Sequence, residues 1–278
     1  MCNFCVAHGM GTKWYLNPKN LELKMAYEDP EVRAIWEEVA LGPKGLVDFT
    51  AAANALPEEM PYSQESLDLM NEQLAKMTGG QIAPIEDALR ILKIVDKSDM
   101  KIGLTICACR KLWGGKTKFS CMHFEPFCDM LTKVYGTLSK HDRYITTDEA
   151  IEICKESNKE GLIQWIEWTA MPFVTAICNC ELPYCLAIRT RILSGIQNAA
   201  MKSHYIALVD PSKCDGCGGS PQCLLACNFG AIRFSRLEQF AVVDPTVCFG
   251  CGVCRSKCET KAIKLIDKES VAVAKDLW

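Results

Sequence analysis

The chain has 278 residues, of which 49% are hydrophobic, and a formal net charge of −3. This length supports two or three compact units with packed cores, and the charge excludes the strongly basic surface typical of nucleic-acid-binding proteins. Eighteen cysteines far exceed ordinary usage. No apolar leader or run of membrane-spanning length is visible, so we expect a cytoplasmic protein whose reduced cysteines bind metals.

Residues 1–80 are acidic and are expected to be mostly helical, with short helices at 31–40 and 64–77. The segment opens with Cys2-x2-Cys5-x2-His8-Gly9. This spacing is not that of covalently attached haem, because two residues separate Cys5 from His8. Cys2 and Cys5 are candidate metal ligands, since a shared metal would hold a chain end that is otherwise poorly ordered.

Residues 81–202 alternate between helical and strand-like patterns. We expect helices at 86–97, near 127–138 and at 147–160, a strand at 101–106, and a hairpin of strands at 162–168 and 173–177. Thr146 and Glu149 form a capping box for the helix at 147–160, and Gly161 closes it. Cys154 lies among apolar residues of that helix and is expected to be core. The order helix, helix, hairpin predicts a winged-helix-like, mixed α/β domain.

The other cysteines of this domain gather at the ends of predicted strands. One strand runs into Cys107-x-Cys109, and another runs into Cys178-x-Cys180-x4-Cys185. If the two strands lie side by side, these thiols converge on a third metal site. Further candidate ligands are Cys121 and Cys128. An iron–sulfur cluster, structural zinc and unligated core thiols all remain open, and spacing does not decide which four cysteines would serve.

Residues 203–278 contain two cysteine runs. They read Cys214-x2-Cys217-x5-Cys223-x3-Cys227 and Cys248-x2-Cys251-x2-Cys254-x3-Cys258. A strand-like stretch ending in Asp-Pro precedes each run, and Ala-Ile follows each, so the segment is an internal repeat of one unit. Closely spaced thiolates of this kind bind cubane iron–sulfur clusters. Zinc also accepts Cys-x2-Cys, but it does not account for the duplicated pattern.

The segment 204–270 resembles a bacterial-type two-[4Fe–4S] ferredoxin. In that family the fourth cysteine of each run ligates the other cluster. The resemblance therefore implies two ligand sets: Cys214, Cys217, Cys223 and Cys258 for one cluster, and Cys248, Cys251, Cys254 and Cys227 for the other. The chain departs from the family in the five residues at 218–222, where two are usual, and in Asn228 and Glu259, where proline is usual. Neither change removes a ligand.

The middle segment also resembles the cysteine-rich domain of a group of iron–sulfur proteins from anaerobes. The matching stretches are Cys-Ala-Cys-Arg at 107–110, Ile-Thr-Thr-Asp-Glu-Ala at 145–150, Gly-Leu at 161–162 and Ile-Cys-Asn-Cys at 177–180. The resemblance implies domain limits and metal binding, and no activity comes with it. The fold class expected for the whole chain is α+β, with a ferredoxin-like domain after the mixed α/β part.

The sequence lacks the glycine-rich loops of dinucleotide- and ATP-binding proteins and the usual hydrolase motifs. Its four histidines look isolated apart from His8. We therefore expect an electron-transfer protein or redox-complex subunit that passes single electrons through two [4Fe–4S] clusters to a protein partner or a further cluster. Two alternatives remain: a redox enzyme with a catalytic iron–sulfur site in the middle domain, and a redox-sensing DNA-binding regulator. Exposed clusters are oxygen-labile, so an anaerobic setting is expected.

Overall fold

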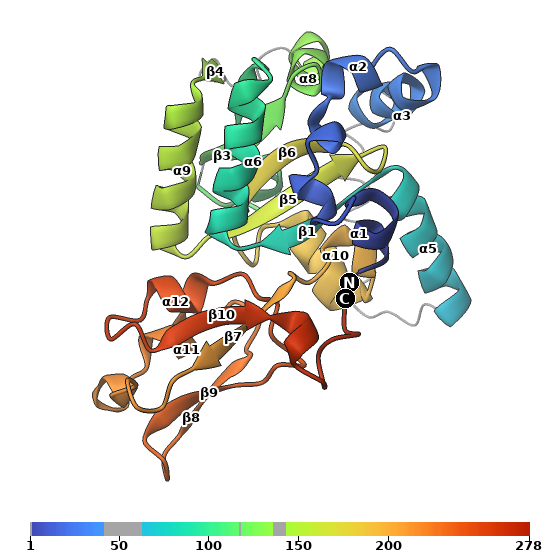
Figure 1. Ribbon diagram of the computed structural model, residues 1–278. Helices are drawn as coiled ribbons and strands as arrows, with labels where there is room; N and C mark the ends of the chain where they lie inside the picture. Colours follow the sequence, from blue (N-terminus) through green and yellow to red (C-terminus); the bar gives the residue numbers. More distant parts are fainter. Residues whose placement is uncertain (1, 42–62, 117, 136–142) are drawn as a thin grey trace.

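The computed structural model describes residues 2–41, 63–116, 118–135 and 143–278. It combines helices with antiparallel sheets (Figure 1). The N-terminal elements are α1 (Asn3–His8), η1 (Trp14–Leu16), η2 (Pro18–Leu21), α2 (Leu23–Ala26), α3 (Pro30–Leu41) and α5 (Gln64–Lys76). The following elements are β1 (Thr78–Ala83), α6 (Ile85–Lys97), β2 (Ile102–Ile106), α7 (Ala108–Leu112), β3 (Phe119–Phe124), α8 (Phe127–Tyr135), β4 (Arg143–Ile145), α9 (Thr147–Glu160), β5 (Ile163–Thr169), β6 (Val174–Cys180), α10 (Leu186–Ser194) and η3 (Gln197–Ala199).

Strands β1 to β6 form one sheet in the order β1-β5-β6-β3-β2-β4. All its strand pairs are antiparallel. Alternation along the strands gives the sheet two different faces. One face, with Ile166 and Ile177, packs against α6 and α9, while the other carries Cys178, Cys121 and Trp165 beside α10. Figure 1 shows α6 and α9 side by side over the sheet, with α10 behind it.

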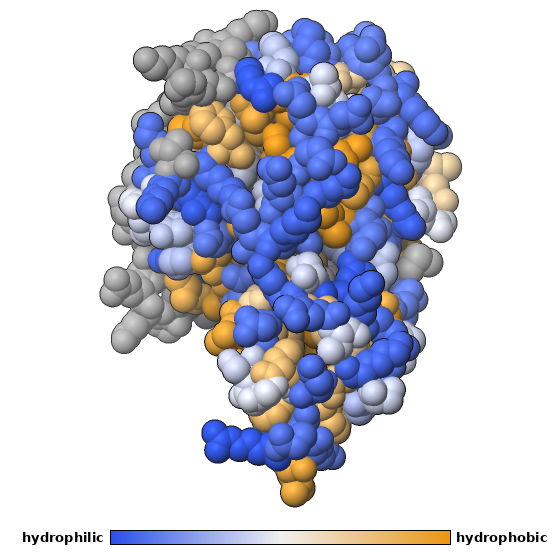
Figure 2. All heavy atoms as spheres, turned by 90° about the vertical axis from the view of Figure 1, so that its left-hand side faces the viewer, coloured by the Kyte–Doolittle hydropathy of each residue, from blue (hydrophilic) through white to orange (hydrophobic). Residues whose placement is uncertain are grey.

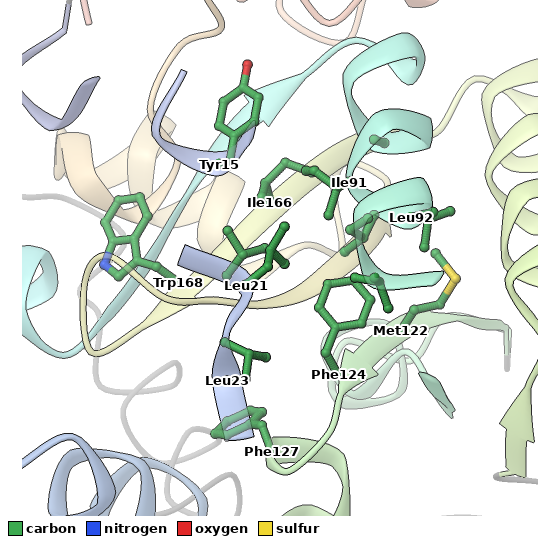
Figure 3. Packing of buried hydrophobic residues seen from close by; sticks show 14 of the residues in the cluster. Tyr15, Leu21, Leu23, Ile91, Leu92, Met122, Phe124, Phe127, Ile166 and Trp168 are labelled. Carbon is green, nitrogen blue, oxygen red and sulfur yellow. The ribbon is translucent and has the colours of Figure 1, made fainter. Parts of the chain in front are cut away.

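The N-terminal helices share the core on the α6 face (Figure 3). Leu21 and Leu23 are buried against side chains from α6, β3 and β5. Trp36, also buried, donates its indole N–H to the carbonyl oxygen of Thr169 at 2.7 Å. Because one continuous set of apolar side chains spans these elements, residues 2–41 belong to the domain built around the six-stranded sheet. This sheet domain is the larger module of the chain.

The C-terminal residues build a smaller module with its own apolar cluster. Its elements are β7 (Tyr205–Val209), η4 (Gly216–Gly219), α11 (Gln222–Leu225), β8 (Ile232–Ser235), β9 (Phe240–Val243), α12 (Val253–Ser256), β10 (Ile263–Asp267) and η5 (Lys268–Ser270). β7 pairs with β10, and β8 pairs with β9. The N–H of Asp210 donates to Ala262 at 2.8 Å, and that of Asp244 donates to Ala231 at 2.7 Å. These matched contacts give the module a two-fold repeat.

The two modules meet where α12 lies against the ends of α6 and α9. Arg255 forms an ion pair with Glu86 at the start of α6. The hydroxyl of Ser256 donates to the carbonyl oxygen of Asn158 at 3.4 Å, and the Asn228 side chain donates to Gly161 at 3.4 Å. The segment between η3 and β7 links the two modules. This linker also joins the sheet, because the N–H of Met201 donates to the carbonyl oxygen of Gly80 at 2.8 Å.

Most predicted elements are confirmed, including the capping box of α9 and the hairpin β5–β6. The mixed α/β class with antiparallel sheets is also confirmed. The winged-helix expectation is wrong, because β5 and β6 lie within a six-stranded sheet. Sequence reasoning missed β1, β3 and β4. The part of the predicted helix beyond residue 135 lies outside the described residues.

The surface is mixed in polarity. Figure 2 shows one face on which hydrophilic side chains dominate the larger part, with hydrophobic groups among them and at the tip of the narrower part. Within the described residues, no helix combines the length and apolarity that crossing a membrane requires.

Candidate metal centres

The cysteines of the C-terminal module lie in two groups of four, and each group draws on both runs. Electrostatic interactions join Cys223 to Cys214, Cys217 and Cys258. We call these four cysteines the outer group. Burial is the main cause that raises the pKa of Cys223 to about 11, followed by the charges of these neighbours.

The inner group consists of Cys227, Cys248, Cys251 and Cys254. Cys254 interacts with Cys251, Cys248 and Cys227 and, least of all, with Cys223 of the outer group, and burial is the main cause that raises its pKa. A cavity beside these thiols has an almost entirely apolar lining, which includes all four cysteines. The crossed pairing of Cys227 with the second run and Cys258 with the first follows from the two-fold repeat of the module. It is the arrangement that the ferredoxin resemblance implies.

Backbone N–H groups point at several of these sulfurs. Ala231 donates to the Sγ of Cys227 and Ala262 donates to the Sγ of Cys258, both at 3.3 Å, and Gly250 donates to Cys248 at 3.3 Å. Such bonds stabilise thiolates and tune bound clusters. Gly250 has φ 67°, and a Cβ there would lie 2.0 Å from the carbonyl oxygen of Tyr205, so only glycine permits this loop.

The outer and inner groups differ in how exposed their surroundings are. Cys217 of the outer group is exposed, and the nearby Leu225 is 72% exposed. Beside the inner group, Phe229 and Phe249 stack with ring centroids 3.9 Å apart and an interplanar angle of 11°. The outer group therefore reaches the surface at Cys217, although its Cys223 is buried, while apolar side chains pack against the inner group.

Six cysteines of the larger module lie on the α10 side of its sheet, and we call them the middle group. Its members are Cys107, Cys109, Cys121, Cys178, Cys180 and Cys185. Strands β3 and β6 place Cys121 directly opposite Cys178. Cys107 caps α7 and Cys185 caps α10, so these two cysteines sit where strand or loop turns into helix.

The thiols of the middle group interact in a chain. Cys109 and Cys121 both lower the pKa of Cys107, to about 3, and Cys107 is the main cause that raises the pKa of each of them. Cys178 interacts with Cys121 and Cys180, and Cys180 in turn with Cys185. Interacting buried thiols are suited to metal binding, because a cation stabilises all of them as thiolates.

An ion pair lies beside the middle group, between residues that are neighbours of its cysteines in the sequence. Arg110 pairs with Glu181, and the guanidinium lies 5.0 Å from the centroid of the Tyr184 ring. The N–H of Arg110 also donates to the Sγ of Cys107 at 3.4 Å. These contacts tie the Cys107–Cys109 segment to the Cys180–Cys185 segment, so the two convergent strand ends are held together.

Two other cysteines have different surroundings. Cys128, a predicted candidate ligand, is not placed with the middle group: its sulfur is 3.8 Å from the Asp129 carboxylate and close to Gly103. The reason is that Cys128 lies on α8, past the end of β3, whereas Cys121 lies within the strand. Cys154 is fully buried in the main core, as expected.

Cys2 and Cys5 lie close together at the start of α1, with Sγ atoms 3.2 Å apart. Their third neighbour is His204, whose Nε2 lies 3.3 Å from the Cys5 sulfur. The interpretation of His204 as isolated is therefore wrong, and His8 does not join this group. Nearly two hundred residues separate the partners, so no spacing signal could have found His204. His141, also thought isolated, lies outside the described residues.

One apolar cluster connects the inner and middle groups. It contains Cys178, Cys180 and Cys185, with Cys121 and Cys251 packed against it. The side chains between them include Ile82, Ile163, Phe249 and Val253. Residues from both cysteine groups therefore share a single buried region across the module junction.

No protein-family model, curated protein or solved structure matches this chain.

Proposed function

We propose that the protein transfers single electrons from a protein partner, through two [4Fe–4S] clusters, to a metal centre in the larger module. The outer and inner groups would hold the clusters, which supply one-electron redox chemistry when bound. The observation that carries the proposal is the crossed arrangement of the two cysteine groups, since each closes with the fourth cysteine of the other run.

The residues around the inner group fit a cluster. The lining is apolar apart from the thiols, and N–H groups are available to the sulfurs. The stacked rings of Phe229 and Phe249 line the same cavity and would shield a cluster there from water. Zinc needs a compact tetrahedron of ligands. Among the described residues, neither four-cysteine group has three ligand atoms within 4.8 Å of one another, which favours the larger cubane.

The exposed outer group would be the point of entry. Cys217 reaches the surface, and the exposed Leu225 and Leu237 offer apolar contacts on the same module. Transient redox complexes use small interfaces of this kind. The inner group, by contrast, faces the larger module through the shared apolar cluster, so electrons would leave in that direction.

The middle group is the proposed acceptor. Its six thiols exceed the roughly four that one cubane needs. This surplus also supports a second candidate function, a redox enzyme whose middle cluster keeps an open iron position. The DNA-binding alternative is not proposed again, because the winged helix on which it depended is absent from the described sheet domain.

The first test is the iron and acid-labile sulfide content of anaerobically purified protein, with Mössbauer and electron paramagnetic resonance (EPR) spectra before and after dithionite. The proposal expects about eight irons in two reducible cubanes plus further iron in the middle group. Cys178→Ser should remove only that further iron, whereas the matched control Cys128→Ser should keep it. Clusters that dithionite cannot reduce would contradict the electron-transfer function. Binding of substrate-like small molecules to the middle iron would favour the enzyme.

A further inference from the structure

A separate set of ligand atoms lies where the N-terminal segment meets the module junction. The sulfurs of Cys2 and Cys5 are 3.2 Å apart, and His204 Nε2 is 3.3 Å from Cys5 Sγ and 4.0 Å from Cys2 Sγ. All three residues are buried, with exposed fractions of 1%, 3% and 7%. Within the part of the chain that the structure describes, these are the three side chains of the types His, Cys, Asp and Glu whose ligand atoms all lie within 4.8 Å of one another.

These distances match a single tetrahedral ion. Ligand atoms about 2.0–2.3 Å from zinc, at tetrahedral angles, lie roughly 3.3–3.8 Å from each other. The observed separations of 3.2, 3.3 and 4.0 Å lie in that range or within 0.2 Å of it. A cubane would hold its sulfurs farther apart, because the cluster itself lies between them. The set is therefore suited to one ion and differs in kind from the outer and inner groups.

The charges also favour zinc. Two thiolates balance the charge of Zn²⁺ and a neutral imidazole adds none, so the loaded site is neutral. Burial of a neutral site avoids the cost of an unpaired buried charge. Aromatic rings enclose it: the His204 ring centroid is 4.9 Å from that of Trp278 and 5.8 Å from that of Tyr15.

The backbone is arranged to support the two sulfurs. The N–H of Trp14 donates to Cys5 Sγ and the N–H of Cys5 donates to Cys2 Sγ, both at 3.4 Å. The chain turns back tightly at Gly9, where a Cβ would lie 2.5 Å from the Cys5 carbonyl oxygen and 2.1 Å from that of Thr12. Outer bonds of this kind orient ligands and are typical of built metal sites.

We propose that Cys2, Cys5 and His204 bind one zinc ion, with water as the fourth ligand. His204 directly precedes β7 and follows the linker that joins the modules. The ion would therefore fasten α1 to the linker and hold the ferredoxin-like module in place against the sheet domain. This role is independent of electron transfer, since none of the three residues belongs to the outer, inner or middle group.

The test measures zinc and iron together, by mass spectrometry of the elements, in anaerobically purified full-length protein. Wild type should contain one zinc that His204→Gln and Cys5→Ser each lose, with iron content unchanged. His8→Gln is the matched control and should keep the zinc. X-ray absorption at the zinc edge should show two sulfurs at about 2.3 Å and lighter ligands at about 2.0–2.1 Å.

Three results would overturn the proposal: no zinc in wild type, full zinc in His204→Gln, or a Cys2–Cys5 disulfide in the intact mass of the anaerobic protein. Iron content and cluster EPR report on the electron-transfer function separately. A protein with both cubanes and no zinc would refute only the zinc site, whereas a protein with zinc and no iron would refute only the proposed function.

Discussion

The outer and inner cysteine groups have the same backbone plan but different surroundings. The plan is that of the two cysteine runs from which the groups are built: in each run, a turn that begins at an aspartate leads into the first cysteine, and an alanine N–H donates to the last at 3.3 Å. The outer group opens to solvent at Cys217, while Phe229 and Phe249 cover the inner group. The duplicated loops therefore set which atoms bind, and the surroundings set how each site behaves.

Two cations near the inner group add to this difference. Lys202 is 8% exposed, lies 5.3 Å from the centroid of the Phe249 ring and interacts with Cys248. Arg191 lies over the same ring, at 5.8 Å. Lys202 donates to the carbonyl oxygen of Thr246 and Arg191 donates to an oxygen of Trp278 at 2.9 Å, so both side chains are held beside Phe249 and the inner group. Positive charge favours the reduced, more negative state of a cluster, so a cluster bound by the inner group would be the better electron acceptor.

The largest expected effect comes from removing the crossed ligands. Cys227→Ser should disrupt the inner cluster and Cys258→Ser the outer one, each lowering iron by up to about four per chain. In Cys227→Ser, a reduced outer cluster should no longer pass electrons to the middle group. EPR after dithionite, in each variant, would distinguish the two sites. If both variants lost the same signal, the crossed assignment would be wrong.

Phe249→Ala tests whether apolar cover protects the inner group. Phe249 is 8% exposed and stacks on Phe229, so its truncation should cost about 3–5 kcal/mol of stability and admit water. We expect the inner cluster to bleach several times faster in air, with the outer cluster unchanged. Val247→Ala, at a position that is 38% exposed, is the matched control. Equal bleaching of wild type and Phe249→Ala would contradict a protective role.

Lys202→Met tests the electrostatic difference between the groups. Loss of a buried positive charge near Cys248 should lower the potential of the inner cluster by roughly 59 mV, a tenfold change in a one-electron equilibrium. The matched control is Lys213→Met beside the outer group, where the side chain is 62% exposed and solvent screens the charge. An EPR redox titration measures both. A larger shift in the control would reverse the comparison.

The same contrast explains how far sequence reasoning reached. In the C-terminal module all eight ligand candidates lie in two short runs, so spacing and the repeat indicated the eight cysteines, and the ferredoxin resemblance implied their crossed division into two groups. The middle group depends on the pairing of β3 with β6, and β3 has no spacing signal that joins its Cys121 to Cys178. The strand β1 was missed because its two glycines are typical of turns. In the structure, the Trp165 ring occupies the space above Gly80, where a Cβ would lie 2.2 Å from it.

Tertiary context also decides the remaining site. His204 lies beside Cys2 and Cys5 because the segment before β7 is bonded to the sheet through Met201 and because the N-terminal segment packs on the core of the sheet. A local pattern therefore identifies a ligand set when one loop supplies it. When separate elements supply it, the set is known only once the fold is known.

The middle group adds a third environment, in which the nearby charge is acidic and partly buried. Burial raises the pKa of Glu167 to about 7 from an ordinary 4.5, and its carboxylate accepts a hydrogen bond from Thr169 at 3.5 Å. The folded state holds the proton more tightly than the unfolded state. This contribution to stability is therefore complete below about pH 4.5 and is lost as the pH rises through about 7.

Glu167→Gln should remove this pH dependence and leave the protein about 1–2 kcal/mol more stable than wild type at pH 8, a value reduced for partial solvent access. Chemical denaturation between pH 5 and 8 measures the difference, with the exposed Glu156→Gln as the control. Since the carboxylate also interacts with Cys178, its removal should raise the potential of any centre in the middle group. If the stability of wild type and of Glu167→Gln depended on pH in the same way, Glu167 would be ionised in the folded protein. The electrostatic contrast would then be confined to the outer and inner groups.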